Sequence, residues 1–334
     1  MAKKLIVLLI KLIVVFAISA CNDAQVSILN VSYDPTRELY IDFNKEFNHY
    51  WKEKTGQTIR FSQSHGGSGK QARSIIDGLP AEVATLALAY DIQAIQKAGY
   101  IDDVNWQQRL PYNSAPYYST IVLLVREGNP KNIHDWEDLI RSDVQVITPN
   151  PKTSGGARWN YLAALGYAMG KHQDEQAAIE FVTKLYRNVP VLDTGARGST
   201  TTFTERNIGD VLISWENEAY LAIRELEDET FEIVYPSISI LAETPVVVID
   251  KIVDRRNTRE IAEAYLEYLY SDIGQSIIAK HYFRPRSEQI LQQYKDTFPV
   301  IPLLTIDDFG GWDRVHEKHF SDGAIFDQIY ASKR

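Results

Sequence analysis

The feature that most constrains the fold is the alternation of short apolar runs with helical patterns along the chain. The runs are rich in Val, Ile and Leu: Ile28–Val31, Ile59–Phe61, Thr85–Ala89, Ile121–Val125, Val144–Ile147, Val211–Ile213 and Val246–Ile249. Such alternation is typical of layered α/β proteins. Because 334 residues are many for one hydrophobic core, we expect an α/β fold with two lobes.

The first strand-like run leads directly into a helical pattern. Asp34 follows Val31 closely and can cap a helix, while Pro35 suits a first helical turn. Three apolar side chains then recur on one helical face: Leu39, Phe43 and Phe47. The domain is therefore expected to open with a strand-to-helix unit.

Residues 1–20 have the pattern of an export signal, with Lys3 and Lys4 ahead of an apolar stretch that ends at Ile18. The stretch is too short and interrupted to span a bilayer. The only cysteine, Cys21, follows Ser19-Ala20, and the stretch resembles a bacterial lipobox. We expect Cys21 to become a lipidated first residue; the alternative is a soluble periplasmic protein cut nearby, for example after Ser19. A single cysteine allows no internal disulfide.

The charge balance limits the partners. Removing the three lysines of residues 1–20 from 35 basic residues leaves 32 against 44 acidic residues, a net charge of −12. This balance argues against nucleic acid or an acidic membrane as a partner. Any anion site must therefore depend on local, short-range donors.

Three glycine-rich turns separate strand-like runs from helical patterns. They are Ser64–Lys70 (SHGGSGK), Thr153–Arg158 (TSGGAR) and Thr194–Ser199 (TGARGS). Glycine lets the backbone approach a ligand closely, and a helix start presents unpaired N–H groups at a positive dipole end. One such turn is weak evidence, but three favour an oxyanion site.

Two further features refine this prediction. The first turn is not a nucleotide-binding loop, because Ser64 replaces a required glycine and Gln71 replaces the required Ser or Thr. Trp215 follows a strand-like run, at the carboxyl end where open α/β sheets bind ligands. Its indole N–H can only donate, although a packing role is the common alternative for a tryptophan.

These segments resemble the prokaryotic sulfate-binding protein family. KEKTGQTIRFSQS (Lys52–Ser64) and NPKTSGGAR (Asn150–Arg158) are similar to two signature segments of that family. Further similar blocks are SYDPTREL, SHGGSGKQA, LALAYD, GARGST and DVLISWENEA. The resemblance covers essentially the whole chain after the signal. It implies a type II periplasmic-binding-protein fold, with two lobes closing over one sulfate dianion in the interlobe cleft.

The resemblance also implies a set of ligand-binding residues. Backbone N–H donors would be Ser68, Gly155, Gly156 and Ala196, and side-chain donors would be Ser154 and Trp215. Asp34 and Arg37 are expected to act at a helix start and between lobes, with Gly67 and Arg197 as further supporting residues. Lys70, Arg158 and Arg197 are not expected to contact the anion directly.

The expected function is extracytoplasmic binding of sulfate, and of thiosulfate as well, with delivery to the permease of an ABC importer. We expect a signal peptide at 1–20, lobe 1 at 25–115 plus 240–334, and lobe 2 at 116–239. The protein is expected to be periplasmic, anchored if Cys21 is lipidated, monomeric and without a cofactor.

Three alternatives remain. A receptor for molybdate, tungstate or phosphate would use the same kind of site. A sulfate- or phosphate-ester hydrolase would need Ser64, Ser68 or Ser154 as nucleophile, but adjacent Ser and His do not make a triad and no Gly-x-Ser-x-Gly elbow is present. Metal binding is disfavoured because the seven histidines show no paired ligand spacing.

Overall fold

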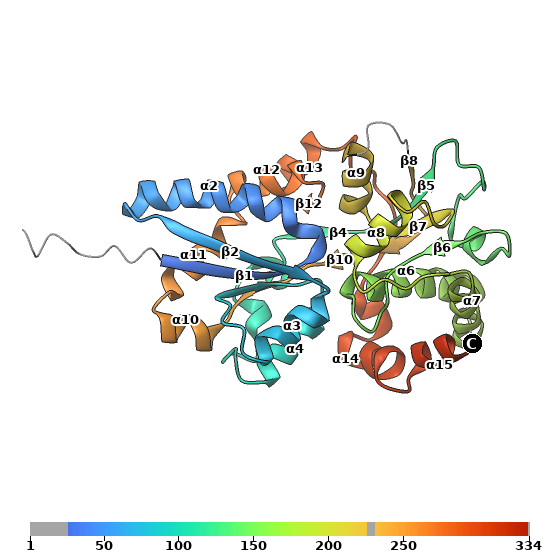
Figure 1. The fold of residues 1–334 in the computed structure, drawn as a ribbon, viewed down its shortest axis with the longest axis horizontal. Helices are drawn as coiled ribbons and strands as arrows, with labels where there is room; N and C mark the ends of the chain where they lie inside the picture. The colour runs from blue at the N-terminus through green and yellow to red at the C-terminus, as the bar shows by residue number, and fades with distance from the viewer. Residues whose placement is uncertain (1–25, 226–230, 333–334) are drawn as a thin grey trace, which may run out of the picture.

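A computed structural model of the chain describes residues 26–225 and 231–332. The predicted export signal and Cys21 lie outside the described residues. Two separate four-stranded sheets, each covered by helices, form the two ends of the elongated molecule (Figure 1). The expected α/β architecture is confirmed. No helix among the described residues is long and apolar enough to cross a membrane.

The first half of the molecule is built on the sheet β11-β3-β1-β2. Its strands are β1 (Val26–Tyr33), β2 (Ile59–Gly66), β3 (Val83–Thr85) and β11 (Val246–Val248). Its helices are α2 (Arg37–Thr55), α3 (Ser68–Ile76), α4 (Ala89–Lys97), α10 (Asp250–Arg256), α11 (Arg259–Tyr268) and α12 (Asp272–Lys280). The strands β1, β2 and β3 are parallel and β11 is antiparallel to β3.

The second half is built on the sheet β6-β7-β5-β8. Its strands are β5 (Ile121–Arg126), β6 (Val146–Ile147), β7 (Val211–Trp215) and β8 (Phe231–Val234). Its helices are α6 (Gly155–His172), α7 (Glu175–Arg187), α8 (Ala196–Thr204) and α9 (Glu216–Glu225). Every residue of β7 is buried, because helices cover both faces of this sheet.

A three-stranded sheet joins the halves and is called here the crossing sheet. It has the order β10-β4-β12, with β4 (Tyr117–Ser119), β10 (Ala242–Glu243) and β12 (Arg284–Pro285). The chain enters the second half through β4 and returns to the first half through β10. After β12 the chain crosses a third time, so the sequence contains no single linker.

The C-terminal segment packs on the second half. Its elements are β13 (Leu303–Leu304), α14 (Trp312–Val315) and α15 (Ile325–Ala331), and β13 pairs with β9 (Ser239–Ile240). Figure 1 shows α15 beside α7, far from α10 and α11. Phe326 packs edge-on against Tyr186 of α7, with ring centroids 5.2 Å apart. The chain after Leu303 therefore lies with the second sheet, although the sequence assigned all of residues 240–334 to the first lobe.

One apolar run differs from its expected strand. The strand β3 ends at Thr85, and the rest of the run Thr85–Ala89 turns into α4, which begins at Ala89. The apolar side chains of this turn, Leu86, Ala87 and Leu88, are buried. Periodicity cannot distinguish a short buried strand from a buried turn.

Candidate functional site

Residues from both halves surround one small hollow with about 180 Å³ of atom-free space, including the part open to solvent. All six residues expected to bind the anion line it: Ser68, Ser154, Gly155, Gly156, Ala196 and Trp215. Asp34 and Gly67 line it as well, whereas Arg37 and Arg197 do not. None of the described lining residues is a lysine or arginine. The geometry therefore brings together N–H and O–H donors without a direct counter-charge.

Three helices begin at this hollow. Ser68 is the first residue of α3, Gly155 and Gly156 open α6, and Ala196 opens α8. The first N–H groups of a helix have no partner within it and carry the positive end of the helix dipole. Because α3 belongs to the first half and α6 and α8 to the second, donors approach the hollow from both sides.

The side chain of Ser154 has the geometry of a helix cap. Its Oγ accepts a hydrogen bond from the Ala157 N–H at 3.3 Å. The hydroxyl proton remains available to donate, since accepting uses only a lone pair. Ser154 can therefore cap α6 and donate to a ligand at the same time.

Trp215 ends β7 with its indole ring buried and only 1% exposed. Its Nε1–H has no hydrogen-bond acceptor among the described residues. A buried donor without a partner costs free energy, on the order of 1–3 kcal/mol. An oxyanion in the hollow would supply the acceptor that the protein does not.

At two glycines of the site a side chain would collide with a neighbouring residue. A Cβ on Gly156 would lie 2.3 Å from Nε1 of Trp215, and one on Gly67 would lie 2.5 Å from the Thr153 carbonyl oxygen. Gly67 lies in the first half and Thr153 in the second. The two halves are therefore in contact, with the hollow closed between them.

The Ser68 hydroxyl is already engaged in two hydrogen bonds within the first half. Its Oγ donates to Asp91 Oδ2 at 2.5 Å and accepts from the Ala87 N–H at 3.1 Å. Arg158 of the second half lies 3.6 Å from the other Asp91 oxygen. Burial raises the pKa of Asp91, while Arg158 and Ser68 act in the opposite direction. The Ser68 backbone N–H is thus the group positioned as a donor.

Arg197 forms an ion-pair network beside the hollow. Its guanidinium contacts both carboxylate oxygens of Glu38 at 3.1 Å and pairs with Glu218 at 2.9 Å. Burial raises the pKa of Glu218 against the lowering effect of Arg197. Glu38 lies in the first half and Glu218 in the second. Arg197 therefore connects the halves, in agreement with an indirect role.

Asp34 does not cap the helix as the sequence suggested. It is the first residue of a 3-10 turn, Asp34–Thr36, and makes no capping hydrogen bond. Its Oδ1 accepts from Arg37 Nη2 at 3.3 Å, and its Oδ2 lies 2.5 Å from where a Cβ on Gly195 would stand. Pro35 already sets the geometry of the turn, so the turn does not need Asp34 as a cap. The Asp34 carboxylate instead faces the second half.

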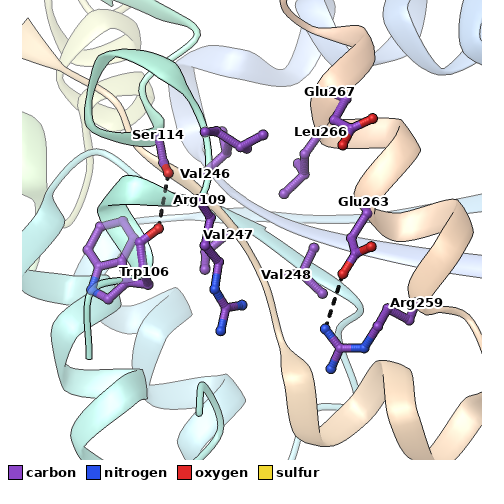
Figure 2. A pocket seen from close by; sticks show the side chains of 11 residues that line it. Trp106, Arg109, Ser114, Val246, Val247, Val248, Arg259, Glu263, Leu266 and Glu267 are labelled. Atoms are coloured by element: carbon purple, nitrogen blue, oxygen red, sulfur yellow. Dashed lines mark hydrogen bonds and ion pairs between the residues drawn. The ribbon is translucent and has the colours of Figure 1, made fainter. Parts of the chain in front are cut away.

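A larger hollow, with about 760 Å³ of atom-free space, lies elsewhere in the first half, between the loop that carries Trp106 and helix α11 (Figure 2). Its two arginines, Arg109 and Arg259, both contact the carboxylate of Asp250 at 2.8–3.0 Å. Glu263 and Glu267 also line it. The positive charge is already neutralised, so this hollow is a poor anion site.

The residues of the hydrolase alternative do not form a triad. His65 hydrogen-bonds through Nε2 to Gln63 at 2.8 Å, while Ser68 bonds to Asp91. Burial, the largest cause, together with nearby Arg37 lowers the pKa of His65 to about 4. No group of three or more His, Cys, Asp or Glu side chains among the described residues is arranged to hold a metal ion.

Sequence reasoning missed several residues of the site. Tyr33, Pro35, Gly66 and Ala87 also line the hollow, and Asp91 orients Ser68. Tyr33 and Pro35 flank Asp34, and Ala87 and Asp91 lie in the LALAYD block. Their place in motif blocks was the available signal, but a buried tyrosine or alanine has no distinctive donor chemistry.

Comparison with known proteins places this chain in a family. Residues 40–284 match the model of the bacterial extracellular solute-binding proteins. The chain is 61% identical over 312 residues to the sulfate-binding protein of Escherichia coli strain K12, covering 93% of this chain and 94% of that protein. It is 50% identical over 316 residues to the thiosulfate-binding protein of Pseudomonas aeruginosa, covering 94% and 95% respectively.

The solved structures agree. The sulfate-binding protein SubI from Mycobacterium tuberculosis H37Rv superposes with a TM-score of 0.81 at 32% identity, covering 89% of this chain and all of that one. A periplasmic thiamin binding protein shares the fold alone, with a TM-score of 0.69 at 14% identity, covering 93% and 97%. The expected two-lobed type II fold is confirmed. The chain belongs to the sulfate-binding protein family of bacterial extracellular solute-binding proteins.

Proposed function

We propose that the protein binds sulfate outside the cytoplasm, and thiosulfate as well, and delivers it to the permease of an ABC importer. The observation that carries this proposal is the convergence of three helix starts and the unpartnered Trp215 Nε1–H on one hollow. Relatives named for sulfate and thiosulfate binding match nearly the whole chain. A closed hollow of this size suits one small anion.

Each donor has a proposed role. The backbone N–H groups of Ser68, Gly155, Gly156 and Ala196 would bind oxygens of the anion, as would the Ser154 hydroxyl and the Trp215 indole. The ion pairs of Arg197 and Arg158 would hold the helix starts that these side chains adjoin in place, and they would add no net positive charge because both arginines are already paired with carboxylates. Gly67 would allow the close approach of the halves. The Asp34–Arg37 pair would order the rim of the hollow.

Calorimetric titration of the desalted mature protein tests the choice of anion. Sulfate should bind tightly and thiosulfate measurably, while phosphate should fail to compete. Molybdate, which is unprotonated but larger, tests size alone. Tighter binding of molybdate or phosphate than of sulfate would reassign the receptor to another tetrahedral oxyanion.

We further propose that the two halves are lobes that open and close around the anion. The first lobe would comprise about residues 26–115 with 240–302, and the second about 116–239 with the C-terminal segment, on the packing of β13 and α15. Small-angle scattering should show a smaller radius of gyration when sulfate is added, because donors from both lobes favour the closed state. An unchanged profile at saturating sulfate would contradict closure.

Three finer expectations stay proposals. The protein would act as a monomer, which light scattering after size exclusion checks. It would have no catalytic activity, which a chromogenic sulfate-ester assay checks. Cys21 would carry a lipid anchor, and mass spectrometry of membrane-extracted protein decides between this modification and an unmodified terminus at another residue.

A further inference from the structure

Two of the three connections between the halves run through the crossing sheet, β10-β4-β12, and the third follows β12. In this sheet Glu243 of β10 pairs with Tyr118 of β4, and Arg284 of β12 pairs with the same tyrosine from the other side. The crossings at β4 and β10 are therefore hydrogen-bonded into one small sheet, and its third strand, β12, leads to the third crossing. The segment Arg284-Pro285-Arg286 at this edge bears two arginines.

The first of these arginines reaches into the second half. Arg284 forms two hydrogen bonds of 2.7 Å with the Glu216 carboxylate, and both side chains are almost fully buried. Glu216 follows Trp215 directly, and its N–H donates to the Thr120 carbonyl at 3.0 Å. Arg284 thus ties the crossing sheet to the strand end that bears the indole donor.

The second arginine, Arg286, holds β4 and β10 together on the side of the first half. Arg286 Nη2 pairs with Glu243 Oε1 at 2.7 Å, and Nε donates to the Ala115 carbonyl at 3.0 Å. Its guanidinium lies 4.9 Å from the ring centroids of both Tyr112 and Tyr118. One side chain therefore contacts β10, β4 and the turn that precedes β4.

That preceding turn has an unusual backbone. Tyr112, Asn113 and Ser114 are consecutive non-glycine residues with φ of 56°, 59° and 58°. The left-handed conformation is unfavourable for such residues and persists only where surrounding contacts impose it. Ser114 Oγ donates to the Trp106 carbonyl at 3.2 Å (Figure 2), and Arg286 covers the Tyr112 ring. A strained turn held by side chains thus adjoins the first crossing, at β4.

We propose that Arg286 is a positioning residue that sets the angle between the two halves. By joining the left-handed turn, β4 and β10, it holds the crossing sheet in the twist of the closed molecule. It does not touch the hollow, so it acts on the anion only by keeping the two sets of donors together. This inference rests on the proposed function as an anion receptor that closes.

Stopped-flow tryptophan fluorescence of sulfate binding tests the inference with Arg286→Ala and Arg286→Lys. The alanine variant should release sulfate about five- to tenfold faster, with an association rate within about twofold of wild type, because only the closed state loses contacts. Lysine keeps the charge opposite Glu243 but not the planar fork or the stacking, so an intermediate rate is expected. Arg141→Ala is the matched control, since Arg141 pairs with Asp138 and Asp143 in the second half.

A lower melting temperature with an unchanged dissociation rate would overturn the inference and leave Arg286 a structural role only. If the alanine variant does not fold, the lysine variant decides by the same criterion. Scattering at saturating sulfate gives a second readout. A radius of gyration larger than that of sulfate-bound wild type supports the inference, and a profile identical to it contradicts the inference, whereas a wild-type profile that does not respond to sulfate contradicts the proposed function instead.

Discussion

At the scale of single residues, neutral N–H and O–H donors line the hollow, whereas the lysine and arginine side chains near it do not line it. Hydrogen bonds to a charged group contribute about 1.5–3 kcal/mol. Trp215→Phe or Ser154→Ala should therefore weaken sulfate binding by roughly one to two orders of magnitude in calorimetry, without unfolding the protein. Lys70→Ala is the control, because Lys70 is exposed and does not line the hollow. A larger loss in the lysine variant would indicate a direct ion pair.

Whether phosphate can compete with sulfate depends on whether Asp34 can accept a hydrogen bond from the phosphate O–H. Sulfate is fully ionised at physiological pH, whereas phosphate retains a proton that needs an acceptor. The backbone N–H groups and the indole cannot accept it, the Ser154 hydroxyl already accepts from Ala157, and Asp34 already accepts from Arg37. An unsatisfied buried O–H costs about 1–3 kcal/mol. Phosphate should therefore not compete with sulfate at equal concentration between about pH 5 and 8. If it does compete, Asp34→Asn should abolish that competition, because Asp34 is the one carboxylate among the described lining residues.

At the scale of elements, the start of α6 must approach the end of β7 without a side chain between them. Gly156→Ala would place a methyl group against the Trp215 indole, so sulfate affinity should fall at least tenfold by calorimetry. Gly170→Ala in the same helix is a matched control, since nothing lies within 4 Å of its Cβ position. Alanine in a helix interior is favoured by about 0.5–1 kcal/mol over glycine. The control should thus melt at a slightly higher temperature and bind sulfate normally.

At the scale of the whole molecule, the C-terminal segment connects the halves through a histidine. His316 stacks on Tyr90 of α4, with ring centroids 4.1 Å apart. Burial, followed by Arg158 and Lys152, lowers its pKa from 6.5 to about 4. Between these two values the unfolded chain binds a proton that the folded protein does not, so the free energy of unfolding decreases as pH falls through this window.

This contribution can be isolated by substitution. His316→Phe keeps an aromatic ring against Tyr90 but removes the titrating group. The decrease in melting temperature between pH 7 and pH 5 should be smaller in the variant than in wild type. His65 and His319, whose pKa values are also lowered to about 4, remain in both proteins and cancel in the comparison. An equal decrease in both proteins would contradict the assignment.

The sequence by itself determined the local chemistry of the site. Glycine-rich turns before helices and a donor-only indole after a strand depend on neighbouring residues, so SHGGSGK, TSGGAR, TGARGS and Trp215 could be selected without a structure. All six anion-binding residues that the family resemblance implied in these segments line one hollow. The alternation of runs likewise predicted the α/β class, because secondary structure follows mainly from local patterning.

Only the tertiary structure decided which distant groups meet. The contacts of Arg158 with Asp91, of Arg197 with Glu38, and of the C-terminal segment with α7 join residues far apart in the chain. The capping role suggested for Asp34 was wrong for a related reason, since its carboxylate faces Gly195 across the interface. Such pairings leave no periodic trace in the sequence, because they depend on how the two sheets are oriented when the chain has crossed between them three times.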